Sequence, residues 1–296
     1  MAGVRDPEWR FAARWDFRRC TQCGVFWLDP APLPTEMWKA YTAYHTHGRQ
    51  RGQAWLSLMH RFIRLLWWAR WQRNGLWREM QALRFMFLRA AVPGRLLDVG
   101  CGGGRFMRRM HKLGWQVEGN DFDPQAAARV QRDYGLPVHI GDLAACNLPA
   151  GHYDAITLSQ AIEHVYDPAA TLREIHRLLK PGGLLVLTTP NPESRCAHTW
   201  GVHWRGWEAP RHVQLFPLAT LRALCEQQHY EVVEARISAA GTAGTWRVSR
   251  ELAGDAPRSF AAAVMRLWWS YVEEARDARA GCGQNVIVIA RKPALA

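Results

Sequence analysis

The chain has 296 residues, of which 48% are hydrophobic, so it is long enough for one large domain with a packed core. Its formal net charge of +12 favours an anionic partner, and a basic solvated surface explains the same charge equally well. Its seven scattered cysteines argue against a disulfide framework, and no uncharged apolar run approaches the roughly 18 residues of a membrane span.

Residues 1–50 are expected to form an N-terminal segment with half a zinc knuckle. Cys20-Thr-Gln-Cys23-Gly24 has the form of a knuckle, with the glycine permitting the turn after the second thiol. A structural zinc needs four ligands, and the chain has no second C-x-x-C. We therefore expect no loaded zinc site, with His45 and His47 as the alternative completing ligands. The first 30 residues contain no apolar core of a signal peptide.

Residues 51–92 are predicted to form a helical cap. Apolar side chains recur at helical spacing from Leu76 to Ala90, and the piece from Trp55 to Trp71 is apolar almost all round, with arginines between. Such a helix could lie on a membrane, with its tryptophans at the level of the headgroups. We interpret it as a cap over a cofactor site and keep membrane contact as the alternative.

A strand, a glycine loop and a helix begin the main domain, which we expect to span residues 93–296. The apolar run that ends at Val99 predicts a buried strand, and Gly100, Gly102 and Gly104 allow a sharp turn after it. The following helix would aim its unpaired N–H groups at a ligand.

This loop does not fit a dinucleotide. In the pattern G-x-G-x-x-G, counted from Gly100, the last position is Arg105. Asp98 lies two residues before the first glycine, and a carboxylate suits a cationic amino-acid group better than a pyrophosphate. The loop therefore predicts a cofactor with a cationic amino-acid part.

The next predicted strands end in residues suited to the rest of such a cofactor. A carboxylate at Asp121 can accept hydrogen bonds from both ribose hydroxyls, with Phe122 beside the adenine. Asp142 can accept from the adenine amino group, while the backbone N–H of Leu143 meets a ring nitrogen. Ser159, at the end of the fourth strand, is a further candidate for cofactor contact.

Five motifs in one order resemble the class I S-adenosylmethionine (SAM) dependent methyltransferases. They are Asp98 to Gly104, Asp121, Asp142-Leu143, the Glu163-His164 stretch and Leu179-Lys-Pro-Gly-Gly. The resemblance covers roughly residues 94–240 and the last strand. It is strongest to the branch of ubiquinone-biosynthesis O-methyltransferases and zinc-ribbon-linked small-molecule methyltransferases.

The resemblance implies an α/β fold with SAM as the cofactor. A Rossmann-like sheet of seven strands, mostly parallel with an antiparallel last strand, would be flanked by helices and preceded by the helical cap. SAM would lie across the carboxyl ends of the first strands.

The sequence departs from part of the family at a metal motif. Some ubiquinone-type relatives carry E-x-x-E-H, with the acidic residues tied to a metal. Here Gln160 takes the place of the first glutamate, ahead of Glu163 and His164. A neutral amide is a poor ligand for a hard cation, so we expect no metal.

Two inserts, residues 192–216 and 239–283, are expected to shape the acceptor pocket or, for the second, a dimer contact. The first insert is rich in Trp and contains Pro-Arg211-His212. Its aromatic faces and Arg211 could hold an anionic substrate. His212 or His164 could act as a general base. A structural role for each histidine stays open, because methyl transfer often needs only alignment.

The sequence thus predicts an enzyme that transfers a methyl group from SAM to a small-molecule acceptor, at oxygen. The alternatives are a non-catalytic SAM-fold protein that binds a partner or a membrane, and a methyltransferase acting on lipid or RNA. Nucleic acid is disfavoured, because the chain has neither an N/D-P-P-Y/F motif nor a recognisable RNA-binding module. The free cysteines favour the cytoplasm, with peripheral membrane contact as the alternative. Nothing in the sequence indicates an oligomeric state.

Overall fold

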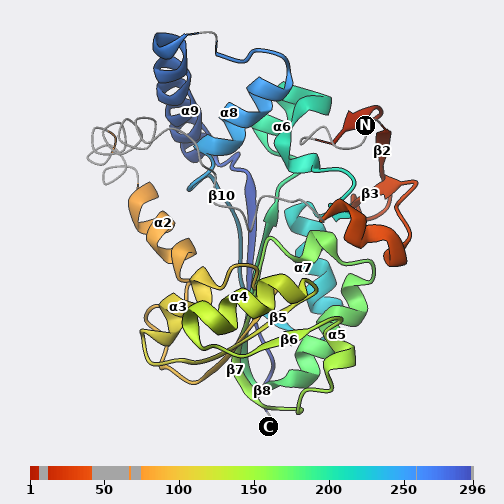
Figure 1. Cartoon of the computed structure of the whole chain (residues 1–296), viewed down its shortest axis with the longest axis vertical. Helices are drawn as coiled ribbons and strands as arrows, with labels where there is room; N and C mark the ends of the chain where they lie inside the picture. The colour runs from red at the N-terminus through yellow and green to blue at the C-terminus, as the bar shows by residue number, and fades with distance from the viewer. Residues whose placement is uncertain (7–12, 42–66, 68–74, 258, 295–296) are drawn as a thin grey trace.

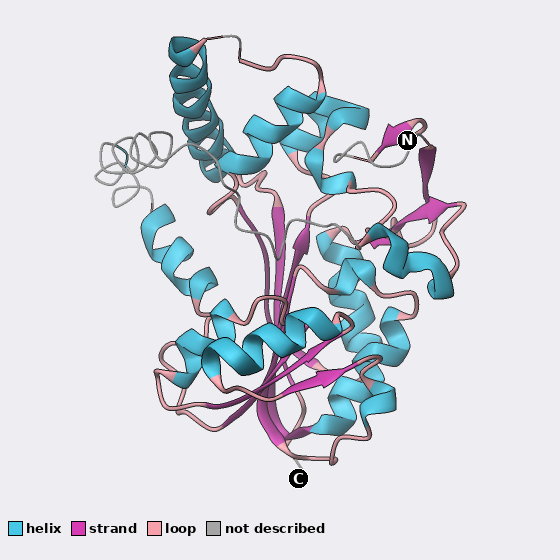
Figure 2. Ribbon diagram, in the orientation of Figure 1, coloured by secondary structure: helices cyan, strands magenta, loops and turns pink. Residues whose placement is uncertain are grey.

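The computed structural model describes residues 1–6, 13–41, 67, 75–257 and 259–294. These residues build a seven-stranded sheet flanked by helices and a smaller four-stranded sheet beside it (Figures 1 and 2). His45, His47 and nearly all of the predicted 55–71 helix lie outside the described residues.

The large sheet has the strand order β10-β11-β8-β7-β4-β5-β6. All neighbouring pairs from β8 to β6 are parallel, whereas β11 runs antiparallel to both β8 and β10. The predicted sheet, with its antiparallel last strand, is therefore confirmed. The strands are β4 (Arg95–Val99), β5 (Gln116–Asp121), β6 (Val138–Ile140), β7 (Tyr153–Ser159), β8 (Leu179–Pro190), β10 (Glu231–Ser238) and β11 (Asn285–Arg291).

Helices cover both faces of this sheet, which explains why its central strands are apolar throughout. Successive strand residues point to opposite faces. Ile156 thus packs with α5 (Pro168–Leu178) and α7 (Leu218–Gln227), whereas its neighbour Ala155 packs with α3 (Arg105–His111). Val130 of α4 (Pro124–Tyr134) belongs to the second of these cores.

Local sequence determines where the flanking helices begin. Asp123 accepts a hydrogen bond from the backbone N–H of Gln125, and Pro124 occupies the first turn of α4. Asp167 and Pro168 start α5 in the same way. These pairs satisfy an otherwise unpaired N–H and supply a φ angle already suited to a helix.

The N-terminal segment and the first insert share the small antiparallel sheet, which has the order β1-β2-β3-β9. Phe26 of β3 pairs with Leu215 of β9. Between these strands and α8 (Ala243–Leu252) lies a core that contains Trp204, Trp207 and Trp246. The tryptophan-rich insert therefore contributes much of a hydrophobic core. The elements are β1 (Val4–Arg5), β2 (Arg14–Arg19), β3 (Phe26–Asp29), η1 (Pro34–Ala40), α6 (Arg195–Trp200), η5 (Gly201–His203), η6 (Arg205–Trp207) and β9 (Gln214–Leu215).

The second insert forms two helices, α8 (Ala243–Leu252) and α9 (Phe260–Ala280), which lie with α6 at one end of the molecule (Figure 1). α2 (Leu76–Arg84) joins this region, and Trp67 is only 4% exposed because it packs 5.0 Å from the ring of Trp268. Among the helices that the structure describes, none is both long and apolar enough to cross a membrane.

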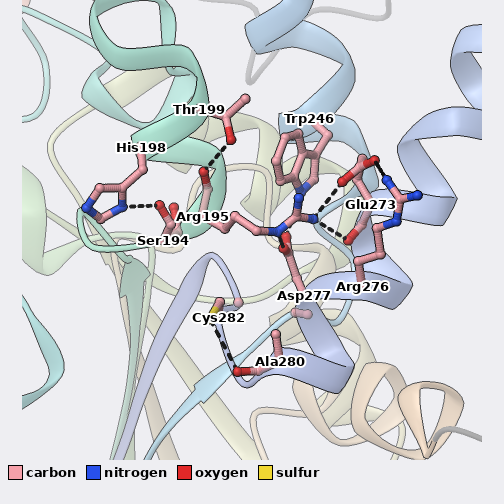
Figure 3. A network of polar contacts seen from close by, with 12 residues as sticks. Ser194, Arg195, His198, Thr199, Trp246, Glu273, Arg276, Asp277, Ala280 and Cys282 are labelled. Carbon is pink, nitrogen blue, oxygen red and sulfur yellow. Dashed lines mark hydrogen bonds and ion pairs between the residues drawn. The ribbon is translucent and has the colours of Figure 1, made fainter.

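A polar network fastens the two inserts to each other (Figure 3). Nε of Arg195 donates to Asp277 at 2.7 Å, and the indole N–H of Trp246 donates to the other oxygen of the same carboxylate at 2.6 Å. The guanidinium of Arg195 also lies 4.5 Å from the Trp246 ring centroid. α6, α8 and α9 are thereby held as one unit above the sheet.

Candidate cofactor and acceptor site

The predicted site residues converge at one edge of the sheet. The parallel register places Val99 of β4 beside Asn120 of β5 and Leu158 of β7, and it places Asp121 beside Ile140 of β6. The loops that follow these four strands therefore meet at the carboxyl end, where ligands bind in open α/β sheets.

The glycine loop turns where other residues would not fit. Gly100 has a φ of +73°, and a Cβ there would lie 2.8 Å from the Cβ of Ala161. Gly104 has a φ of +64°, and its Cβ would lie 2.7 Å from a methyl group of Val130. Gly102 also has a positive φ, and its N–H donates to Asp121 at 2.7 Å. The loop is thus tied to the end of β5.

Asp98 is a buried carboxyl group that suits a cationic ligand. It is 4% exposed and accepts a hydrogen bond from the hydroxyl of Thr157 at 2.7 Å. Burial raises the pKa of Asp98 to about 7. The hydrogen bond from Thr157 lowers this pKa, and the nearby negative charge of Asp121 raises it further. An ammonium group in the adjacent loop would stabilise the ionised carboxylate.

Asp121 anchors two loops with its carboxylate. One oxygen accepts from the N–H of Gly102 and the other accepts from the N–H of Asp123 at 2.9 Å. Each carboxylate oxygen retains capacity for a further donor, as a ribose hydroxyl would be. The sequence reasoning did not identify Asn120, whose side-chain amide donates to the carbonyls of His139 and Gly141 at 3.2 and 3.0 Å.

The residues predicted for adenine follow β5 and β6. Phe122 is 69% exposed, which leaves its ring open to stacking. Asp142 accepts from the N–H of Ala144, whereas the side chain of Leu143 is buried in the core, so that only its backbone is suited to a ligand contact. Ser159, at the end of β7, accepts a 3.4 Å hydrogen bond from Thr188.

His164 and His212 come together from distant segments. Their ring centroids are 4.7 Å apart, His164 lying in η4 (Ile162–His164) directly after β7 and His212 lying just before β9. Nδ1 of His164 lies 3.0 Å from the carbonyl oxygen of Arg211 and 2.9 Å from the hydroxyl of Tyr41. Nδ1 of His212 lies 2.8 Å from the carbonyl oxygen of Gly206.

Burial keeps this cluster uncharged. It lowers the pKa of His164 and lowers that of His212 to about 3, against the opposing influence of Glu208 on both. It raises the pKa of the fully buried Glu163 to about 8. Because a carbonyl oxygen only accepts, Nδ1 of each imidazole carries the hydrogen and Nε2 keeps a lone pair.

Arg211 is committed to the interior and does not face a substrate, contrary to the expectation from the sequence. Its side chain is fully buried and pairs with Asp6 at 3.0 Å and with Glu208 at 3.3 Å. It also donates to the carbonyl of Ala40 at 3.4 Å. Arg211 therefore joins the N-terminal segment to the turn that carries His212.

The predicted half knuckle lies in the turn between β2 and β3. Cys20 is half-buried and Cys23 is exposed, and both are free thiols. Backbone N–H groups, that of Cys23 foremost, lower the pKa of Cys20. In the part of the chain that the structure describes, no group of three metal ligands includes either thiol.

The comparisons with known proteins identify the class. The sequence matches the family described as "Methyltransferase domain" over residues 68–235, which is more than half of the chain. The chain therefore belongs to this family, and with its sheet and glycine loop it is an enzyme of the class I SAM-dependent methyltransferases.

A curated relative matches part of the chain. A ubiquinone biosynthesis O-methyltransferase of Xanthomonas campestris is 39% identical in an alignment of 136 positions, and this alignment covers 41% of this chain and 56% of the relative. The chain thus spans just over half the length of this curated relative.

Solved structures show the shared fold. A phosphoethanolamine N-methyltransferase 2 of Haemonchus contortus, in complex with S-adenosyl-L-methionine, has a TM-score of 0.53 at 19% identity and covers 73% of this chain and 53% of its own. The [4+2]-cyclase SpnF has a TM-score of 0.51 at 21% identity and covers 73% of this chain and 81% of its own.

Proposed function

We propose that the enzyme transfers the methyl group of SAM to an oxygen atom of a small-molecule acceptor. The observation that carries this proposal is the convergence of two carboxylates, a glycine loop and two neutral imidazoles at one edge of the sheet. The name of the Xanthomonas relative supports oxygen as the acceptor atom.

In this proposal the glycine loop and Asp98 hold the methionine part of SAM. Glycines at 100, 102 and 104 let the backbone approach the ligand, and Asp98 faces the ammonium group. Asp121 accepts from the ribose hydroxyls. The adenine would stack on Phe122, with Asp142, the Leu143 backbone and Ser159 at its edge.

The protein's task in the transfer is alignment and removal of one proton. The sulfonium carbon of SAM is electrophilic, so an acceptor oxygen in line with the S–CH3 bond forms the new C–O bond as S-adenosylhomocysteine leaves. The hydroxyl proton must also depart. His212 or His164 would accept it through the lone pair on Nε2, against the burial that lowers the pKa of both imidazoles.

The cysteines support a reducing compartment such as the cytoplasm for this enzyme. All seven are free thiols, and Cys101, Cys196 and Cys225 are buried in the cores. Buried thiols without disulfides are typical of proteins kept under reducing conditions.

The affinity for SAM is expected to depend on pH through Asp98. Its pKa of about 7 means that the carboxyl group is mostly protonated below pH 6 and must ionise to attract the ammonium group. The dissociation constant should therefore fall by about tenfold per pH unit from pH 5 to 6.5 and level off near pH 7.5. Titration calorimetry across this range measures the effect.

The Asp98→Asn variant is the control for this pH dependence. Its amide does not ionise, so it should bind SAM weakly at every pH with no slope. If the affinity of the wild-type protein for SAM is constant from pH 5 to 7.5, Asp98 does not bind the ammonium group.

A panel of acceptors tests the reaction class. The purified enzyme is incubated with SAM and, separately, with catechols, other phenols, amines and thiols, and the products are analysed by mass spectrometry. A methyl ether formed together with S-adenosylhomocysteine is the expected result. Methylation confined to nitrogen or sulfur would contradict the proposal. Methylation of none of them, with SAM bound, would favour a non-catalytic or non-methylating role, as the fold shared with a [4+2]-cyclase permits.

A further inference from the structure

A carboxyl group and two imidazoles meet beyond the end of β7. Glu163, His164 and His212 each offer one ligand atom, and these atoms all lie within 4.8 Å of one another. Nε2 of His212 is 3.9 Å from Oε1 of Glu163. This separation is too long for a hydrogen bond and is close to the roughly 3.4 Å that separates two ligands of a tetrahedral ion.

Glu163 presents an unsatisfied oxygen to this space. Its side chain is fully buried, and Oε2 accepts from the hydroxyl of Thr189 at 2.8 Å. Among the described residues, none forms a hydrogen bond with Oε1. An unpaired buried polar atom costs about 1–3 kcal/mol and calls for an explanation, which a bound cation would provide.

The two imidazoles are oriented as metal ligands usually are. The carbonyl of Gly206 receives the Nδ1 hydrogen of His212, and the carbonyl of Arg211 receives that of His164. Such backbone acceptors fix the tautomer and leave Nε2 able to bind a metal. Glu208, 3.7 Å from Nε2 of His212, pairs with two arginines and places further negative charge behind the site.

We propose that Glu163, His164 and His212 bind one divalent transition-metal ion, and that Zn²⁺ matches this donor set best. One carboxylate with two imidazoles suits a borderline metal, and zinc is bound by such a set in hydrolases. Mg²⁺ prefers oxygen ligands and fits poorly. Gln160 led us to expect no metal because it breaks an acidic motif for a hard cation. The third ligand comes instead from the first insert.

A role for this ion rests on the proposed function. η4 follows the strand that ends at the SAM site, and the charge of Asp121 acts on His164. A metal with three protein ligands keeps an open position and acts as a Lewis acid, which would lower the pKa of an acceptor hydroxyl. While the ion occupies Nε2 of both histidines, neither imidazole can accept the proton, so the ion would take the place of the general base and the hydroxyl proton would pass to solvent.

Cobalt binding tests the site without any methyl transfer. The full chain carries Cys20→Ser and Cys23→Ser, so that the two thiols of the half knuckle do not bind the probe. After removal of metals by a chelator, it is titrated with Co²⁺, and visible absorption and the metal content per chain are measured. We expect one equivalent of Co²⁺, displaced by Zn²⁺ and unaffected by Mg²⁺.

Single variants assign the ligands. Loss of a hydrogen bond that supports a metal ligand weakens metal binding by roughly 10–100-fold. Glu163→Gln and His212→Gln remove a ligand itself, so each should weaken Co²⁺ binding by more than this. His198→Gln, which changes an exposed histidine of α6, should leave it unchanged. Thermal unfolding measurements check that each variant is folded. If His212→Gln does not fold, Glu163→Gln still tests the site, because glutamine keeps the shape of the glutamate side chain.

The outcomes separate this proposal from the proposed function. Absence of binding to the parent that carries Cys20→Ser and Cys23→Ser, displacement by Mg²⁺, or binding that survives both ligand variants would overturn the site. One equivalent of metal in a protein that methylates no acceptor would leave the site standing and contradict only the proposed reaction.

Discussion

Replacing Asp121 with alanine is expected to weaken SAM binding by about 100-fold. The substitution removes the carboxylate proposed to accept from two ribose hydroxyls. It also releases the N–H groups of Gly102 and Asp123, which the same carboxylate now binds at 2.7 and 2.9 Å. A hydrogen bond to a charged group contributes about 1.5–3 kcal/mol, and every 1.4 kcal/mol is a tenfold change in affinity.

Two further variants separate the ribose contact from the loop geometry. Asp121→Asn keeps the shape and one acceptor oxygen, so we expect a loss of about tenfold. Asp133→Ala removes an exposed acid of α4 that pairs with Arg132 and should not change the affinity. The dissociation constants are measured by titration calorimetry. Wild-type affinity in the alanine variant would show that Asp121 does not bind the ribose.

Replacing Arg211 with methionine is expected to lower the free energy of unfolding by about 3–5 kcal/mol. The guanidinium is fully buried between Asp6 and Glu208, and Asp6 is itself 1% exposed. Removing the cation leaves carboxylates in the interior without its charge. Such a loss costs far more than the intact pair contributes, because the buried carboxylates lose the cation that lies between them, although Glu208 keeps its pair with Arg205.

The control for this prediction is Arg222→Met. Arg222 pairs with Glu226 at 2.8 Å on the surface of α7, with side chains 57% and 47% exposed. Exposed pairs of this kind contribute about 0.3–0.5 kcal/mol. Denaturant unfolding of both variants measures the difference. If Arg211→Met and Arg222→Met have the same free energy of unfolding, Arg211 does not join the N-terminal segment to the first insert.

Loss of Arg211 should also disturb the acceptor side of the site. The backbone carbonyl of residue 211, which Arg211→Met keeps, orients His164, and His212 is the next residue, so a shift of this turn would move both imidazoles. The unfolding measurement and the cobalt titration therefore both test the turn that carries Arg211 and His212.

The large sheet was predictable because its signals are local. The apolar run before Asp98, the glycines after it, and the Asp–Pro pair at 123 and 124 each determine a strand, a turn or a cap within a few residues. Parallel pairing then brings the strand ends together, which is why the sequence could place Asp121 and Asp142 at one edge of the sheet, while their contacts with a cofactor stay a prediction.

The first insert could not be interpreted correctly from its composition. Trp204, Trp207 and Arg211 have the character of a ligand pocket, yet their partners come from strands near the N-terminus and from α8. Asp6 lies 205 residues away from Arg211 in the chain, and no local pattern reports such a pair. The nearness of His212 to Glu163 was hidden for the same reason.

The most direct test of the central claim is methyl transfer from labelled SAM. The purified enzyme and SAM with a labelled methyl group are added to an extract of the organism that encodes the chain, which is then separated into small-molecule, lipid, protein and RNA pools. The proposed function predicts label in the small-molecule pool, lost in Asp121→Ala. Label confined to RNA, protein or lipid, or no transfer to any pool while SAM binds, would contradict it.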